Sequence, residues 1–100
     1  MRIVSQDGKY DIPYEKAIIR LQEQSTKNGI QYLLVAELTG SLFRSSPIVI
    51  GKYTKESYAR YALGDISSAY NSGYWILRYF VLTEHQVKNR FKEDENENNN

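Results

Sequence analysis

Acidic residues recur every four positions near the start of the chain, at Asp7, Asp11 and Glu15. Neighbouring carboxylates can act as an acid–base pair or bind a cation through their oxygens. Here, however, Asp7 and Gly8 lie between two β-prone runs and predict a tight hairpin turn of type I′, in which both central residues have positive φ. That geometry does not bring the three carboxylates together, and the segment lacks the spacing of a calcium loop. We expect no cofactor and no metal site here.

The residue types that most often support catalysis are scarce. His85 is the single histidine and the chain has no cysteine, so a thiolate nucleophile and a disulfide framework are excluded and a zinc site is disfavoured. The sequence contains no Gly-x-Ser-x-Gly motif and no glycine-rich phosphate loop. We therefore expect His85 to be an ordinary exposed side chain and the protein not to be an enzyme.

Aromatic residues are the most unusual feature of the composition, with nine tyrosines in 100 residues. Tyrosine is amphipathic and favours strands, so one interpretation places these rings in the core and at its boundary. The other interpretation places them on a contact surface, because aromatic and arginine side chains are enriched at binding hot spots. The residues that we expect on such a surface are Arg60, Tyr61, Tyr74, Arg78, Lys88 and Arg90.

Charge is distributed unevenly along the chain. The net charge is +1, but residues 93–100 hold four of the 12 acidic residues and no base, which leaves 13 bases and 8 acids, or +5, on residues 1–92. The acidic, asparagine-rich end is expected to be a disordered, solvated tail. A second interpretation has this tail folding over a basic surface and competing with an anionic partner.

A basic body with many aromatic residues also raises the alternative of nucleic-acid binding, through base stacking and phosphate contacts. The bases are scattered from Arg2 to Lys92, with a cluster only at Lys88, Arg90 and Lys92. The sequence has no RNP-type or helix-turn-helix pattern. Nucleic acid is therefore the less favoured partner.

Apolar runs and alternations predict that most of the chain forms strands. The pattern predicts an N-terminal hairpin at 2–6 and 9–12, a half-buried strand at 16–24, a central strand at 30–38, a strand at 48–53 and a closing aromatic strand at 74–82. The segment 16–24 also contains good helix formers, but its apolar residues alternate at period two, which favours a strand. The closing strand is apolar on both faces, with Leu77 on the face of Val81 and Phe80 on the other.

An amphipathic helix is predicted at residues 54–72, where apolar residues recur at spacings of three and four. Thr54 is the expected N-cap, and Gly73 is available for a left-handed C-cap. Gly64, in the middle of this helix, either lets it approach the sheet closely or weakens it.

Residues 83–92, after the closing strand, could form a short helix. Thr83 and Gln86 have capping-box spacing, and Val87 and Phe91 would share one face. Together the elements predict an α+β fold, with a mainly antiparallel β-sheet of about five or six strands and one amphipathic helix packed on one face. Residues 1–92 are the expected single domain, ahead of the tail.

The N-terminal residues lack the apolar stretch of a signal peptide. The longest apolar run, residues 32–36, is far too short to span a bilayer. We therefore expect a soluble protein of the cytoplasm, which the absence of cysteine also fits.

The N-terminal sequence resembles that of a known group of proteins. Residues 1–8, MRIVSQDG, and 11–15, DIPYE, are similar to the opening of small uncharacterised prophage-type proteins of Gram-positive bacteria, with a looser likeness over residues 51–70. The resemblance implies a phage or mobile-element origin and no known activity, so it assigns no functional residue. We therefore expect an accessory protein that binds another protein or itself.

Overall fold

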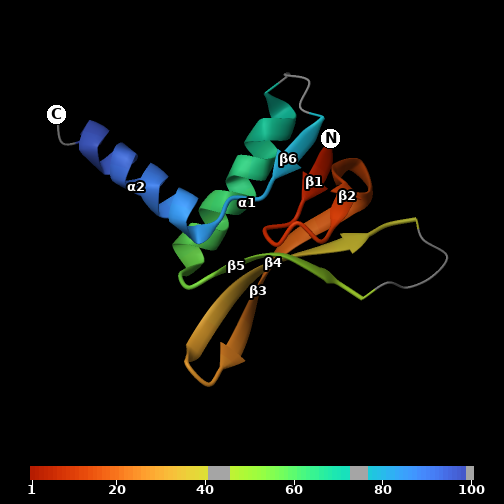
Figure 1. Cartoon of the computed structure of the whole chain (residues 1–100), viewed down its shortest axis with the longest axis horizontal. Coiled ribbons are helices and arrows are strands. Elements are labelled where there is room, and N and C mark those ends of the chain that lie inside the picture. Colours follow the sequence, from red (N-terminus) through yellow and green to blue (C-terminus); the bar gives the residue numbers. More distant parts are fainter. Residues whose placement is uncertain (41–45, 73–76, 99–100) are drawn as a thin grey trace.

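The computed structural model describes residues 1–40, 46–72 and 77–98, and it has an α+β fold, as expected (Figure 1). Within these residues, six strands form two sheets of three, accompanied by two α-helices. Sheet A has the order β2-β1-β6, and sheet B has the order β3-β4-β5. The strands are β1 (Arg2–Val4), β2 (Asp11–Pro13), β3 (Ala17–Thr26), β4 (Gly29–Leu38), β5 (Ile48–Tyr53) and β6 (Arg78–Phe80). The helices are α1 (Glu56–Asn71) and α2 (Glu84–Asn98), with a short 3-10 helix at Tyr14–Lys16.

β1 and β2 form the expected N-terminal hairpin, but its turn is not of type I′. Gly8 has a φ of +74°, whereas the φ of Asp7 is not positive. The N–H of Gly8 donates to the carbonyl of Ser5 at 2.9 Å. The Asp7 carboxylate accepts bonds from the Ser5 hydroxyl at 2.6 Å and from the Lys9 N–H at 3.0 Å. These local side-chain bonds stabilise the turn without a second residue of positive φ.

Sheet A is completed by β6, which pairs with β1 in parallel. The sequence predicted one mainly antiparallel sheet. Three of the four pairings among the described strands are antiparallel, so the pairing agrees with this prediction, whereas the division into two sheets differs from it. Parallel neighbours need a long crossover connection, and here the connection contains all of sheet B and α1. The strands of sheet A therefore come from opposite ends of the chain.

Sheet B is an antiparallel meander whose central strand is β4, as predicted. Residues 33–36 are all buried, and this is the continuous apolar run that marked the strand as central. On β3, Ala17, Ile19 and Leu21 are partly buried, whereas Ile18 between them is exposed. The alternation at period two therefore correctly predicted a strand rather than a helix.

α1 packs across sheet B and buries Ala59, Ala62 and Ile66 from the predicted apolar stripe. Gly64 lies on the exposed side of this helix, where an added Cβ would meet no atom within 4 Å. Gly64 therefore does not serve a close approach of α1 to the sheet. The expected C-cap, Gly73, lies outside the described residues.

Thr54 is not the N-cap of α1. The cap position is Lys55, which makes no side-chain capping bond. The hydroxyl and the N–H of Thr54 instead donate to one carboxylate oxygen of Glu84, each at 2.6 Å. The residue expected to cap α1 therefore ties the start of α1 to the first turn of α2.

α2 begins with the capping box that the sequence indicated. The N–H of Gln86 donates to the Thr83 hydroxyl at 3.2 Å, and the N–H of Thr83 donates to the Gln86 side chain at 2.9 Å. Val87 is buried and Phe91 is partly buried on the same face. The helix continues to Asn98, although the acidic end of the chain was expected to be disordered. In Figure 1, α2 projects from the body and carries its C-terminal end away from sheet A.

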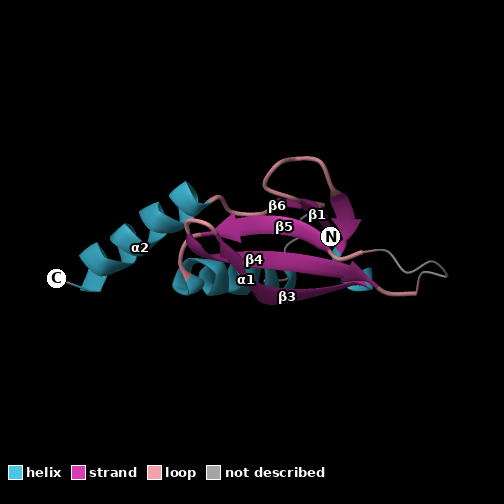
Figure 2. Ribbon diagram, turned by 90° about the horizontal axis from the view of Figure 1, so that it is seen from below, coloured by secondary structure: helices cyan, strands magenta, loops and turns pink. Residues whose placement is uncertain are grey.

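One hydrophobic core joins both sheets to both helices. In Figure 2, α1 runs alongside β3 and β4, and β1 and β6 lie beyond β5. The buried members of this core are Ile3, Ile12, Leu34, Ala36, Ile50, Tyr53, Ala59, Ala62, Ile66, Val81, Leu82 and Val87. No helix in the described ranges is both long enough and apolar enough to cross a bilayer.

The backbone carbonyl of Leu82 lies where several elements meet. Tyr53, which is 1% exposed, donates its hydroxyl to this carbonyl at 2.5 Å, and the side-chain amide of Gln6 donates to it at 2.8 Å. Gln6 also accepts the N–H of Lys52 at 2.7 Å and donates its own N–H to the carbonyl of Ile50 at 2.9 Å. Burial raises the pKa of the Tyr53 phenol, so the hydroxyl stays protonated and able to donate.

Gly51 and Gly64 allow a matched test of packing around this junction. A Cβ at Gly51 would lie 3.0 Å from Cε2 of Tyr53, 3.1 Å from its hydroxyl and 3.3 Å from Cγ1 of Val81. Because both neighbours are buried, we expect Gly51→Ala to lower the free energy of unfolding by about 1–3 kcal/mol. Gly64→Ala should raise it, by up to about 1 kcal/mol, because alanine favours a helix and has room there. Urea denaturation measures both values, and the same sign of change in the two variants would contradict this description.

Glu84 should make the free energy of unfolding depend on pH in the acidic range. Burial alone would raise its pKa, but the hydroxyl and N–H of Thr54 outweigh burial and hold the pKa below the ordinary value of 4.5. A carboxyl group of this kind stabilises the fold above its unfolded pKa and loses that contribution as the pH falls through its folded pKa. We expect Glu84→Gln to be less stable than the parent at neutral pH, with the difference shrinking below the unfolded pKa. Urea denaturation across this pH range tests this, with Glu23→Gln on the exposed part of β3 as control; a difference independent of pH would contradict it.

Candidate functional site

Sheet A has one face in the core and one face turned to solvent. Ile3, in the middle of β1, is fully buried. Because side chains alternate along a strand, its neighbours Arg2 and Val4 lie on the opposite, outer face, where Arg2 is exposed and Val4 is 8% exposed. Arg2 pairs with Arg78 of β6, and Val4 pairs with Phe80. The outer face therefore places two arginines beside an aromatic residue.

Two arginines share one carboxylate on this outer face. Nε of Arg2 lies 2.8 Å from one carboxylate oxygen of Asp11, and Nη2 of Arg78 lies 3.3 Å from the other. Arg2 also donates from Nη2 to the backbone carbonyl of Asp11 at 2.7 Å. Two positive charges around one negative charge leave this cluster with a net positive charge.

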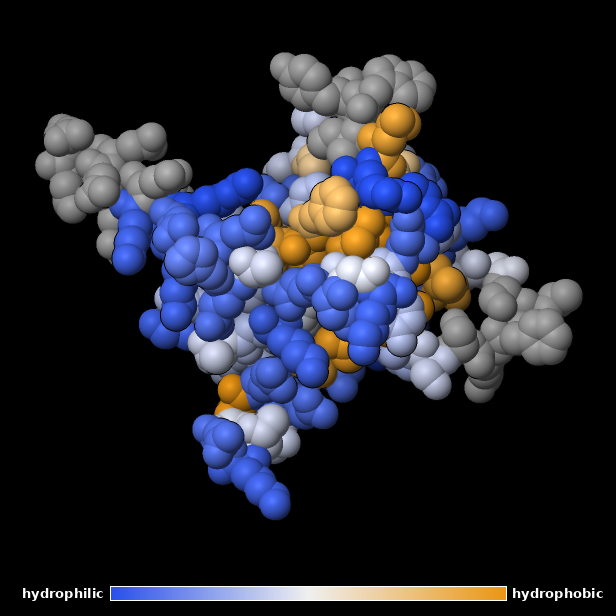
Figure 3. All heavy atoms as spheres, viewed as in Figure 1, coloured by the Kyte–Doolittle hydropathy of each residue, from blue (hydrophilic) through white to orange (hydrophobic). Residues whose placement is uncertain are grey.

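Large apolar side chains are exposed next to these arginines. Leu77 is 77% exposed and Phe80 is 64% exposed, more than any other large hydrophobic side chain of the described ranges. The sequence predicted that Leu77 shares a face with Val81, which is buried. Leu77, however, precedes the first residue of β6, so the alternation of side chains along the strand does not apply to it. Figure 3 shows hydrophobic atoms over β1 and β6 beside strongly hydrophilic ones. We call the group formed by Arg2, Asp11, Leu77, Arg78 and Phe80 the β6 surface.

The β6 surface includes a free strand edge. β6 is the last strand of sheet A and pairs only with β1 among the described strands. The carbonyl of Leu77 and the N–H of Val81 bond to β1 at 2.9 and 3.0 Å. Since backbone groups alternate between the two sides of a strand, those of Arg78 and Phe80 face the free edge. An edge of this kind is a template for pairing with another chain.

The residues that the sequence assigned to an interaction surface come from different elements of the fold. Arg78 belongs to the β6 surface, and Tyr74 lies outside the described residues. The others lie on α1 and α2 and are Arg60, Tyr61, Lys88 and Arg90.

Aromatic packing joins α1 to α2. The ring of Phe91 lies 5.5 Å from that of Tyr58 and 5.2 Å from that of Tyr61, between centroids. Tyr61 is partly buried, whereas Arg60 is exposed and pairs with Glu56 on its own helix at 2.7 Å. The sequence had suggested that Arg60 and Tyr61 are exposed together, but only Arg60 is exposed. Tyr61 serves the docking of α2, which supports the interpretation of this tyrosine as a boundary residue.

Asp65 joins α1 to β6 and to α2. The hydroxyl of Tyr79 donates to one of its carboxylate oxygens, and Nη1 of Arg90 donates to the other at 2.8 Å. Burial and then the bond to Asp65 raise the pKa of the Tyr79 phenol, so it remains a neutral donor. Asp65 also lines a hollow of about 300 Å³ together with Arg60 and Tyr61. Because both carboxylate oxygens already accept bonds, this arrangement fixes the helices rather than offering a free acid or base.

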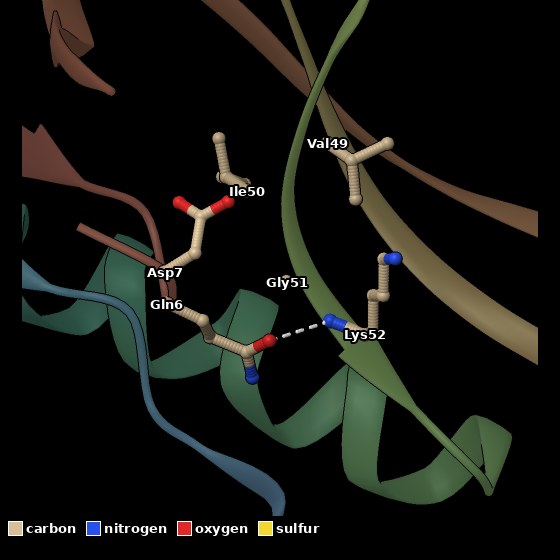
Figure 4. A pocket seen from close by; sticks show the side chains of 6 residues that line it. All are labelled: Gln6, Asp7, Val49, Ile50, Gly51 and Lys52. Carbon is tan, nitrogen blue, oxygen red and sulfur yellow. Dashed lines mark hydrogen bonds between the residues drawn. The ribbon is translucent and has the colours of Figure 1, made fainter. Parts of the chain in front are cut away.

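A second hollow lies between the N-terminal hairpin turn and β5 and has a volume of about 170 Å³. Figure 4 shows Gln6 and Asp7 on one side and Val49 and Lys52 on the other, with the Gln6 side-chain oxygen bonded to the backbone N–H of Lys52. The Asp7 carboxylate points into this region, but its bond from the Ser5 hydroxyl lowers its pKa. It is therefore a poor proton acceptor near neutral pH, and the hollow is a weak candidate for catalysis.

The carboxylates near the start of the chain have separate partners, as expected. Asp7 stabilises the hairpin turn, Asp11 pairs with Arg2, and Glu15 binds the N-terminal ammonium at 2.6 Å. The bond to the ammonium lowers the pKa of Glu15. His85 is exposed, as expected. Within the described part of the chain, no three His, Cys, Asp or Glu side chains are placed to hold a metal ion.

Sequence reasoning missed most of the β6 surface. The aromatic run predicted the alternation of Arg78 and Phe80, and that signal was sufficient to place them on one face. Arg2 and Asp11 belong to the N-terminal hairpin, and no local pattern indicates that this hairpin pairs with the end of the chain. Leu77 was predicted to belong to the closing strand, but β6 begins one residue later, at Arg78.

Comparisons with known proteins do not assign a family. No protein-family model, no curated protein and no solved structure matches this chain. The function must therefore be inferred from the fold and its surfaces.

Asp65 can be compared with a surface carboxylate on the same helix. We expect Asp65→Asn to lower the free energy of unfolding by about 1–3 kcal/mol, because Tyr79 and Arg90 lose a charged acceptor. Glu56→Gln, which disturbs the exposed pair with Arg60, should cost less than about 0.5 kcal/mol. Urea denaturation at neutral pH measures both. An effect of Asp65→Asn no larger than that of the control would show that Asp65 does not hold β6 and α2 to α1.

Proposed function

We propose that this protein is a small, non-enzymatic accessory protein of the prophage type that acts in the cytoplasm by binding another protein, or a second copy of itself, through the β6 surface. The N-terminal resemblance supports the prophage class, and the absence of cysteine fits a reducing compartment. The observation that carries the binding role is the exposure of Leu77 and Phe80 beside Arg78 at the edge of sheet A.

Burial of the β6 surface by a partner would be favourable. Covering a leucine or phenylalanine side chain contributes about 1.5–3 kcal/mol, and neither Leu77 nor Phe80 contributes to the core of this fold. Aromatic and arginine side chains are also the residues most often found at binding hot spots. The surface therefore combines the two residue types that contribute most to protein recognition.

The placement of the basic side chains favours a protein partner over nucleic acid. Phosphate binding needs guanidinium or ammonium groups that are free to replace counterions. Among the described residues, six basic side chains lie in ion pairs: Arg2–Asp11, Arg20–Glu37, Arg60–Glu56, Arg78–Asp11, Lys88–Glu84 and Arg90–Asp65. The excess positive charge of residues 1–92 lies outside these pairs, on side chains spread along the sequence from Lys9 to Lys92 rather than gathered in one segment.

A capture experiment with matched variants tests the proposed function. The full chain, a Leu77→Ser and Phe80→Ser variant, and an Ile18→Ser and Ile30→Ser control would be immobilised and exposed to a Gram-positive bacterial lysate. All four substituted side chains are exposed, so we expect all three proteins to remain folded. Proteins retained by the parent and the control should be lost from the β6 variant, and light scattering should show the same dependence if the partner is a second copy.

Capture or self-association that is unchanged in the β6 variant would contradict the proposed function. Circular dichroism of each immobilised protein ensures that a loss of binding is not a loss of folding. Binding of mixed DNA or RNA at low salt, with no protein partner that depends on Phe80, would favour the nucleic-acid alternative instead.

A further inference from the structure

The free edge of β6 has the geometry to accept an added strand. The carbonyl of Leu77 and the N–H of Val81 are used in bonds to β1, so the backbone groups of Arg78 and Phe80 face outward along the edge. An extended segment that pairs with these groups would continue sheet A by one strand. Strand addition of this kind is a recurring mode of peptide recognition, in which backbone bonds give affinity and side chains give specificity.

The side chains of an added strand are constrained by the alternation of the sheet. Arg78 and Phe80 both lie on the outer face, in register with Arg2 and Val4. Residues at positions i and i+2 of an added strand would share this face and lie beside Arg78 and Phe80. The partner sequence is therefore restricted at two positions that are separated by one residue.

The charge of the outer face favours an acidic residue at the position beside Arg78. Asp11 is divided between two arginines, and its contact with Arg78, at 3.3 Å, is longer than its contact with Arg2, at 2.8 Å. The Arg78 side chain is 62% exposed, and a guanidinium has five N–H donors, so it retains donors for a second carboxylate.

The position beside Phe80 favours an apolar residue. The ring of Phe80 is exposed next to Val4, its partner on β1. An aliphatic or aromatic side chain on the added strand would cover the other side of this ring, as cross-strand pairs do in sheets. The two preferences together define a short pattern of one acidic and one apolar residue.

We infer that the partner is a protein with an extended segment in which a Glu or Asp lies two residues from an aliphatic or aromatic residue, and that this segment adds to sheet A at β6. The inference rests on the proposed function, because it specifies the chemistry of the protein that the β6 surface binds. A second copy is the competing occupant, since its exposed edge strand β3 carries Leu21 and Glu23 two residues apart.

Synthetic peptides test the pattern on the full chain. The probes are blocked eight-residue peptides on a Ser and Thr background that contain Glu-x-Leu, Leu-x-Glu, Lys-x-Leu or Glu-x-x-Leu. Titration into the isotope-labelled protein, followed by amide chemical shifts, gives both the affinity and the site. At least one of the first two peptides should bind about tenfold more tightly than the last two, with shifts at β6 and in the segment that follows it.

Two arginine variants separate the charge effect from general loss of binding. Arg78→Gln should reduce the preference for Glu over Lys to less than about threefold, because the carboxylate loses its charged donor. Arg60→Gln, which removes another exposed arginine paired with a carboxylate, should leave the preference unchanged. A preference for Glu that survives Arg78→Gln, equal affinity for the four peptides, or shifts confined to another element would overturn the inference.

The remaining outcomes distinguish this inference from the proposed function. Dimerisation that Phe80→Ser abolishes would identify a second copy as the occupant and overturn the assignment to a peptide of another protein. Capture from lysate that depends on Phe80, without any preference among the peptides, would overturn the inference alone. Capture that does not depend on Phe80 would overturn the proposed function, and the inference with it.

Discussion

The backbone carbonyl of Leu82 accepts two hydrogen bonds inside the core, from the hydroxyl of Tyr53 and from the side-chain amide of Gln6. A buried carbonyl without a partner is costly, and these two donors, from different parts of the chain, satisfy it where the surrounding residues pack. Leu82 lies between β6 and α2, Tyr53 ends β5, and Gln6 follows β1. The relative positions of sheet A, sheet B and α2 therefore depend on one acceptor and its two donors.

The two faces of sheet A differ in how far their side chains are buried. The inner face contributes Ile3 and Ile12, which are buried, and the position of the sheet is fixed from that side. On the outer face, Val4 is buried outside the shared core, whereas Phe80 stays largely exposed beside Arg78. The stability of the fold does not explain the exposure of Phe80, and the buried inner face of sheet A fixes the position of its strand. Both properties suit a surface that binds a partner.

Most local elements could be predicted from the sequence, because each has a short-range cause. The alternation of Ala17, Ile19 and Leu21 predicted β3, and the capping-box spacing of Thr83 predicted the start of α2. Long-range contacts could not be predicted in this way. Thr54 has the chemistry of an N-cap, but Glu84 from a distant helix takes both its donors. Most of the β6 surface was missed for the same reason, since two of its five residues come from the N-terminal hairpin.

The parallel pairing of β1 with β6 has a consequence for the order in which this fold can form during synthesis. Gln6 and Leu82 are 76 residues apart, so the hairpin of β1 and β2 is synthesised well before the strand that pairs with it. Contacts of such long separation slow folding and prolong the exposure of unpaired edges. In the nascent chain, the edge of β1 that pairs with β6 is therefore unprotected until β6 has been synthesised, and a product that ends before β6 would carry that edge permanently.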